Sequence, residues 1–130
     1  MSPRWLPREA ITAMHGLLLR EHGGAEGLRD PGALDGALAH AEQAAAHGET
    51  RLHVLAAKYG HGLARSHPFM DGNKRIALAA IAVFLELNDH ELTATQVDAA
   101  ATILALAAGE LHEAGLAAWV EADVRPSEGA

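Results

Sequence analysis

The sequence predicts an all-α protein with about six helices in a single domain. Alanine, leucine and glutamate recur at helical spacing along most of the chain, and runs of Val, Ile, Tyr and Phe that alternate with polar residues are missing. The chain has 130 residues, which is long enough to bury one hydrophobic core. It contains no cysteine, so disulfides and thiolate metal sites are excluded.

The first half of the chain carries start and stop signals for three helices. Residues 7–22 form the first, which Gly23 is expected to end. Asp30 and Pro31 are typical of an N-cap and a first helical residue, so the second helix is predicted over residues 31–46. The third is predicted over residues 50–66. The residues expected to face the core are Ile11, Met14, Leu18 and Leu19 in the first helix and Leu52, Leu55, Ala56, Tyr59 and Leu63 in the third.

The second half predicts three more helices. Residues 73–87 are apolar on nearly every side, which is typical of a buried central helix. Thr95 and Asp98 resemble a capping pair for a fifth helix over residues 95–109, and a sixth is expected over residues 110–124. Trp5 and Trp119 are expected to pack against the core, which spans residues 5–124. Residues 125–130 are expected to form a flexible tail.

The charge distribution limits the classes of partner. The net charge of −7 argues against a surface that binds nucleic acid directly. Residues 51–75 nevertheless hold five Lys or Arg against one acid, whereas residues 76–124 hold eight acids and no Lys or Arg. This pattern favours a local site for a small anionic ligand. No segment predicts a membrane span or a signal peptide, and the lack of cysteine fits a reducing compartment, so we expect a cytoplasmic protein.

The turn between the third and fourth helices, HPFMDGNKR at residues 67–75, concentrates the reactive side chains. Gly72 lets the backbone bend and leaves room for a ligand. Asn73, Lys74 and Arg75 then open the buried helix, whose N-terminus offers unpaired N–H groups and a partial positive charge. Lys74 adds a point charge, and Arg75 adds a planar set of donors that matches phosphate oxygens. The turn therefore predicts a phosphate-binding site.

Two further side chains in this turn point to catalysis. Asp71 is an oxygen ligand suited to Mg²⁺ that is held together with substrate phosphates. His67 is of the residue type that most often removes a proton from an attacking hydroxyl near neutral pH. Phe69 is expected to point into the core and anchor the loop. Together these residues predict nucleotide-dependent group transfer onto a hydroxyl; the structural alternative is that they are ordinary turn and cap residues.

Several other residues carry open alternatives. Arg65 lines the phosphate site from the preceding helix or is a surface cation, with equal weight. Arg29 and Asp30 are explained equally well by function and by local hydrogen bonds in their loop. The pairs His40 with His47 and His53 with His61 could share helix faces, but no third metal ligand accompanies either pair, and solvated histidines are the favoured interpretation.

The motif resembles that of the Fic family, which reads HPF, a variable residue, Asp or Glu, GN, Gly or Lys, and Arg. The lysine after the asparagine is similar to the Doc branch, the toxins of Phd–Doc-type toxin–antitoxin modules. The segments HGLLLREHGGAEGLRDPGALDGALAHAE and LAAKYGHGLARSHPF before the motif resemble the family, as do RIALAAIAVFLELNDHEL and LAAGELHEAGLAAWV after it. The resemblance implies a helical Fic/Doc fold over nearly the whole chain.

The resemblance also implies roles for the motif residues. His67 matches the catalytic base, Asp71 the Mg²⁺ ligand, and Asn73 a loop and phosphate contact, while Lys74 and Arg75 match the phosphate-binding pair. Most Fic proteins have glycine at the position of Lys74 and transfer AMP. In Doc, the lysine accompanies a reversed placement of ATP in the site, so the γ-phosphate faces the hydroxyl and is transferred to a threonine of elongation factor Tu. The resemblance therefore implies an ATP- and Mg²⁺-dependent kinase that stops translation, with AMP transfer as the alternative.

Departures from the general pattern agree with the Doc branch. The second arginine of the Fic pattern is missing, because Leu78 stands where it would be. The inhibitory Fic signature, a Ser or Thr four residues before Glu-Gly or Glu-Asn, is also absent. An inhibitor in trans is therefore implied, which in this family is the C-terminal segment of a Phd-like antitoxin. Gly72 stands where Doc has alanine.

A third hypothesis is a non-catalytic module that acts as a co-repressor by binding the antitoxin.

Overall fold

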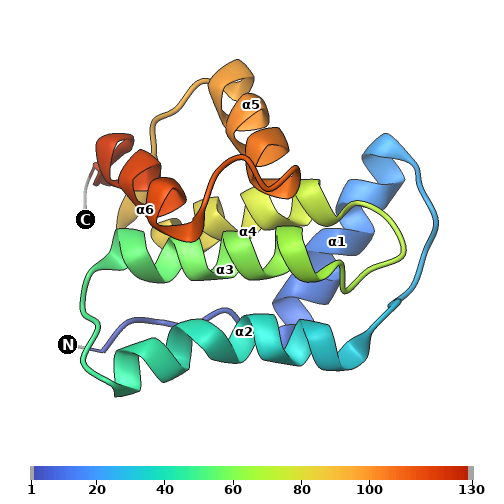
Figure 1. Cartoon of the computed structure of the whole chain (residues 1–130), viewed down its shortest axis with the longest axis horizontal. Helices are drawn as coiled ribbons and strands as arrows, with labels where there is room; N and C mark the ends of the chain where they lie inside the picture. Colours follow the sequence, from blue (N-terminus) through green and yellow to red (C-terminus); the bar gives the residue numbers. More distant parts are fainter. Residues whose placement is uncertain (1, 129–130) are drawn as a thin grey trace.

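The computed structural model describes residues 2–128, in which six helices and a small two-stranded sheet are present (Figure 1). The helices are α1 (Arg8–His22), α2 (Pro31–Ala46), α3 (Leu52–Ser66), α4 (Asn73–Leu87), α5 (Gln96–Ala107) and α6 (Glu113–Ala122). The predicted all-α class is confirmed, and the predicted helix ends differ from the observed ones by three residues at most. No helix among the described residues is long and apolar enough to cross a membrane.

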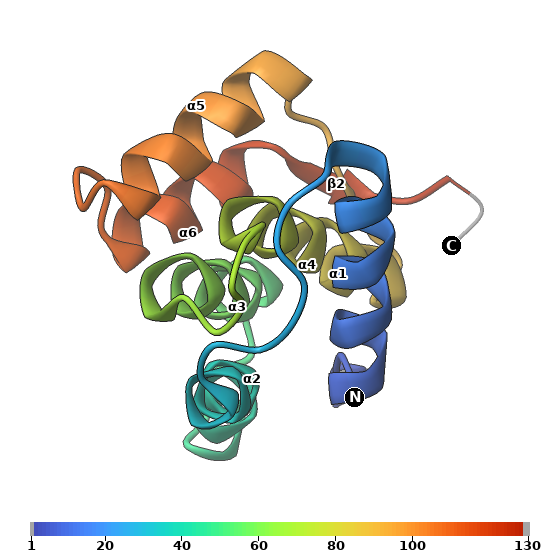
Figure 2. The same cartoon turned by 90° about the vertical axis from the view of Figure 1, so that its right-hand side faces the viewer.

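Helices α3 and α4 lie side by side at the centre of the molecule (Figures 1 and 2). α2 packs on α3, α1 packs on α4, and α5 and α6 lie on the side of α3 away from α2. The two central helices approach closely at Gly60, where an added Cβ would collide with the side chain of Ile81. The prediction that α4 is a buried central helix is confirmed, and α3 shares that position with it.

The helix ends follow the predicted signals. The Asp30 side chain accepts a hydrogen bond from the Ala33 N–H at 3.0 Å, and Pro31 is the first residue of α2. Thr95 caps α5 in the same way by accepting from the Asp98 N–H at 3.1 Å. Gly23 ends α1 with φ 78°, a backbone angle that glycine adopts without strain. These local contacts explain why the element boundaries could be predicted.

The predicted flexible tail is wrong at its start, because residues 125 and 126 belong to a sheet. Strand β1 (His90–Leu92) pairs antiparallel with β2 (Val124–Pro126), and Glu91 faces and hydrogen-bonds Arg125. The Ser127 N–H donates to the Asp89 carbonyl at 2.9 Å. Residues 129–130 of the predicted tail lie outside the described residues. The sheet was missed because three-residue strands are too short for a period-two pattern.

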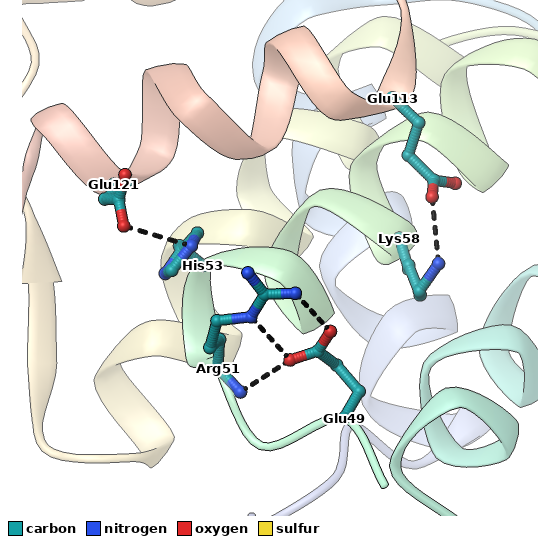
Figure 3. A network of polar contacts seen from close by, with 6 residues as sticks. All are labelled: Glu49, Arg51, His53, Lys58, Glu113 and Glu121. Carbon is teal, nitrogen blue, oxygen red and sulfur yellow. Dashed lines mark hydrogen bonds and ion pairs between the residues drawn. The ribbon is translucent and has the colours of Figure 1, made fainter. Parts of the chain in front are cut away.

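Polar pairs orient α6 on α3 and shape the turn before α3 (Figure 3). Lys58 Nζ lies 2.9 Å from Glu113 Oε2, and His53 Nε2 lies 3.3 Å from Glu121 Oε2. In the turn, Arg51 donates to Glu49 from its backbone N–H and from two guanidinium nitrogens. These hydrogen bonds lower the pKa of Glu49 from 4.5 to about 2, with the Arg51 side chain as the largest cause.

The Glu49–Arg51 contact predicts a pH dependence of stability. A carboxyl group whose pKa is lowered by folding contributes stability above its unfolded pKa, and that contribution is lost as the pH falls from about 5 toward 2. The variant Glu49→Gln should unfold at a lower urea concentration than the parent protein at neutral pH, and the gap should narrow across this range. Glu86→Gln, on an exposed part of α4, is the control. A gap that stays constant with pH would contradict the prediction.

Candidate active site

Residues 67–72, which we call the motif loop, connect α3 to α4 and turn the chain twice. His67 ends α3 in the left-handed conformation, with φ 50° and ψ 59°. Histidine is among the few residue types that tolerate this region better than most. Gly72 is also left-handed, with φ 77°, and immediately precedes α4. The two turns place the side chains of His67 and Asp71 beside the N-terminus of α4, where both line one cleft.

The segment that joins α1 to α2 runs along the motif loop (Figure 2). We call residues 24–30 the strap. The N–H groups of Arg29 and Asp30 donate to the Pro68 carbonyl at 2.8 and 3.0 Å, and the Met70 N–H donates to the Gly27 carbonyl at 3.0 Å. The strap therefore binds the backbone of the motif loop in the manner of a short antiparallel strand pair.

Arg29 secures the beginning of the motif loop with its side chain. Its Nε donates to the His67 carbonyl at 2.6 Å, and its Nη2 donates to the Ser66 carbonyl at 2.8 Å. These carbonyls lie at the C-terminal end of α3, where intrahelical partners are missing. The sequence left Arg29 open between a functional role and local loop bonding. In the structure its guanidinium bonds residues 37 and 38 positions away, so its contacts are not local.

Asn73 and Phe69 lock the middle of the motif loop. Phe69 is 2% exposed, which confirms that its side chain anchors the loop in the core. Asn73, which is 8% exposed, accepts from the Phe69 N–H and donates to the Phe69 carbonyl, both at 3.0 Å. Because the oxygen and the nitrogen of the Asn73 amide both bond Phe69, this side chain makes the loop contact, which is the first of the two roles that the resemblance implies for it.

His15, on α1, contacts the motif loop and was not predicted as a site residue. Its ring stacks on Phe69 with centroids 3.7 Å apart, and its Nε2 lies 2.7 Å from the Asp71 carbonyl oxygen. His15 falls on the same helix face as Ile11 and Leu18, one turn away from each. A polar residue on that otherwise apolar face was the sequence signal that could have identified it.

A cleft of about 580 Å³ opens between the motif loop, the start of α4 and α5. Its polar side includes the predicted site residues, and its apolar side includes Leu78 and residues of α5 that sequence reasoning did not connect to the site. The lining consists of His67, Met70, Asp71, Gly72, Asn73, Lys74, Arg75, Leu78, Ala100, Ile103 and Leu104. The cleft thus has a charged end and an apolar wall, which suits a ligand with both kinds of surface.

The basic residues of the segment 51–75 do not form one patch. Arg51 pairs with Glu49 and Lys58 pairs with Glu113. Arg65 donates to the Ala107 carbonyl at 2.9 Å and is not part of the cleft lining, so its contacts agree with the alternative that keeps it away from the phosphate site. Its guanidinium instead donates to one of the carbonyls at the end of α5 that have no partner within the helix.

Lys74 and Arg75 are the cations that remain available at the cleft. Both are exposed, and neither side chain makes a hydrogen bond or ion pair with another residue in the range 2–128. The first-turn N–H groups of α4 lie beside them, and no side chain among the described residues caps this end. Unpaired cations at an uncapped helix N-terminus provide the charge and donors that phosphate groups require.

The Asp71 carboxylate is exposed at the cleft, with Oδ2 accepting from the Ala25 N–H at 3.2 Å. Within residues 2–128, no group of three or more His, Asp or Glu side chains is arranged to hold a metal ion. One carboxylate next to unpaired cations and free helix N–H groups fits Mg²⁺, which commonly uses one or two protein carboxylates together with substrate phosphates.

The histidine pairs considered in the sequence have other contacts. His53 and His61 lie 3.3 and 3.5 Å from Glu121 and Glu113, respectively, and His47 Nδ1 lies 2.7 Å from the Gln43 carbonyl oxygen. Burial lowers the pKa of His61, although the Glu113 carboxylate acts in the opposite direction. These residues lie apart from the cleft lining.

Replacing Asn73 should loosen the motif loop. Asn73→Ala leaves the buried N–H and carbonyl of Phe69 without their partners, so we expect the free energy of unfolding to fall by about 1–3 kcal/mol. Lys74→Ala, in the same helical turn but exposed, should change it by less than about 0.5 kcal/mol. Urea denaturation of both variants measures the difference. Equal stability of the two variants would show that the Asn73–Phe69 contact does not hold the loop.

The candidate site lies within a segment that matches a known protein family. The model of the Fic/DOC family matches residues 5–85, more than half of the chain. The chain is 34% identical over 86 residues to the protein kinase doc of Escherichia phage P1, covering 65% of this chain and 68% of that protein. It is 44% identical over 75 residues to the toxin Doc of Mycolicibacterium smegmatis, covering 55% of this chain and 57% of that protein. The chain belongs to the Fic/DOC family.

Proposed function

We propose that this protein is a Doc-type toxin that acts as a protein kinase, with ATP and Mg²⁺ as phosphate donor and cofactor and a threonine of elongation factor Tu as acceptor. The observation that carries the proposal is the meeting of His67, Asp71, Lys74 and Arg75 at one cleft beside the uncapped N-terminus of α4. The similarity to relatives named protein kinase doc and toxin Doc supports the same activity.

The chemistry requires few groups, because phosphoryl transfer depends mainly on positioning and charge stabilisation. His67 takes the proton of the threonine hydroxyl as its oxygen bonds to the γ-phosphorus and the bond to the β-phosphate oxygen breaks, which releases ADP. Lys74, Arg75 and the N–H groups of α4 bind the phosphate oxygens. Asp71 would hold Mg²⁺, which neutralises phosphate charge when bound.

Lys74 distinguishes this proposal from AMP transfer. In the family, the lysine accompanies the nucleotide orientation that presents the γ-phosphate, whereas glycine accompanies AMP transfer. The Lys74 side chain is exposed, lines the cleft and has no ion-pair partner in residues 2–128. An unpaired ammonium group at the cleft can attract one phosphate arrangement and obstruct another.

A toxin of this kind needs control, and we infer that a Phd-like antitoxin provides it. No inhibitory signature of the Fic type is present in the sequence. The C-terminal segment of the antitoxin would fold on this protein and block the cleft. We place the toxin and its target in the cytoplasm, where translation occurs.

The direct test is to incubate the purified protein with ATP, Mg²⁺ and elongation factor Tu and to measure the intact mass of the target. We expect the addition of one phosphoryl group. Addition of an adenylyl group would assign the protein to the AMP-transferring branch. An unchanged target, with a toxin that is shown to be folded by circular dichroism, would contradict the proposed activity.

The variant His67→Asn should lower the transfer rate by about 10²–10⁴-fold, because it removes the general base. Asparagine tolerates the left-handed backbone at this position, so the fold is preserved better than with alanine. His22→Asn, at the exposed end of α1, is the matched control and should transfer at the rate of the parent protein. Toxicity of the His67→Asn variant in growing cells would instead favour the non-catalytic co-repressor.

A further inference from the structure

We propose that His15 is a positioning residue of the active site. Its Nε2–H holds the Asp71 carbonyl and thereby places the Asp71 carboxylate and the Gly72 turn relative to His67. The inference rests on the proposed function, because it assigns a consequence for phosphoryl transfer to a residue of α1 that lies outside the motif. The effect of His15 on the motif loop can also be measured without any transfer activity.

The surroundings of His15 leave its ring little freedom. The residue is 4% exposed, and its ring lies nearly parallel to that of Phe69, with an interplanar angle of 12°. Phe69 is itself held through its backbone by Asn73. The imidazole is therefore supported by a residue that cannot shift without breaking two further hydrogen bonds.

The contact with Asp71 determines which nitrogen of His15 carries the proton. A carbonyl oxygen only accepts hydrogen bonds, so the nitrogen 2.7 Å from it, Nε2, must be the donor. Gly72 follows directly, and a Cβ added there would lie 3.5 Å from the same Nε2. The imidazole thus binds Asp71 and occupies the space beside Gly72, the two residues of the second turn of the motif loop.

Asp71 is held at two points that have different origins. His15 binds its carbonyl oxygen, and the Ala25 N–H of the strap binds its carboxylate. Without the first contact, the Asp71 backbone is held less firmly, and a shift of its Cα carries the carboxylate with it. A displacement of about 1 Å at a reacting group can cost about 100-fold in rate. The first half of the motif loop is still held by its hydrogen bonds to Arg29 and Asn73, so the fold does not depend on His15 alone.

A second cavity, of about 330 Å³, lies between α1 and the strap and has His15 in its wall. Leu19, Leu28 and Phe69 line it together with polar residues of α1 and the strap. This space makes chemical rescue possible. When His15 is shortened to alanine, free imidazole can enter next to Phe69 and supply both the ring and the N–H donor.

The experiment compares three variants with the parent protein. His15→Phe keeps an aromatic ring and removes the donor, and His15→Ala removes both. Ile11→Val, one turn earlier on α1 and fully buried, lowers stability while the polar contacts of the motif loop stay intact, and it is the control. Amide hydrogen exchange at Ala25 and Ile76 reports the loop, because their N–H groups bond the Asp71 carboxylate and the Gly72 carbonyl. The kinetic readout is transfer at varied Mg²⁺ concentration.

We expect faster exchange at both amides in the two His15 variants but not in Ile11→Val. The kcat for transfer should fall by about 10- to 100-fold, the Mg²⁺ concentration for half-maximal rate should rise, and the KM for the protein target should stay the same. Imidazole should restore His15→Ala in part and leave His15→Phe unchanged.

Unchanged exchange at Ala25 and Ile76 in the His15 variants would overturn the proposal. So would an Ile11→Val variant that has the melting temperature of the His15 variants and loses as much transfer rate as they do. If the parent protein transfers nothing, the proposed function fails, and the exchange comparison still decides the role of His15.

Discussion

The carbonyl groups of the motif loop are the constraint on which the site depends. Arg29 binds the His67 carbonyl, the strap N–H groups bind that of Pro68, Asn73 binds that of Phe69 and His15 binds that of Asp71. A loop is ordinarily mobile because its backbone groups bond to water. Here the protein replaces water along most of the loop. The backbone is held, while the His67 ring and the Asp71 Oδ1 have no hydrogen-bond partner among the described residues.

The donors for these carbonyls come from different parts of the chain, so the helix packing must be correct before the loop is held. α1 packs on α4 and brings His15 beneath Phe69. The strap reaches the loop because α2 packs on α3 and begins at Pro31, directly after Arg29 and Asp30. The close approach of α3 and α4 at Gly60 keeps the two ends of the loop together. Core packing and site geometry are therefore coupled.

Local pairing of charges leaves unpaired cations at the cleft despite the net charge of −7. Arg51, Lys58 and Arg65 neutralise acids or helix carbonyls away from the cleft. Lys74 and Arg75 keep their charge available where the N–H groups of α4 point in the same direction. The electrostatic field at the cleft depends on which cations have partners, and the net charge of the whole chain does not predict it.

The sequence by itself determined the features that depend on residues close to one another along the chain. The helices, the caps at Asp30 and Thr95, the buried nature of α4 and the grouping of His67, Asp71, Lys74 and Arg75 all follow from spacing along the chain. Tertiary structure decided the contacts that join residues far apart in the sequence. His15 and Asp71 are separated by 56 positions, and Arg65 and Ala107 by 42, and no local pattern encodes such a pair. The β1–β2 pairing and the apolar wall from α5 belong to the same class, because each exists through the packing of distant segments.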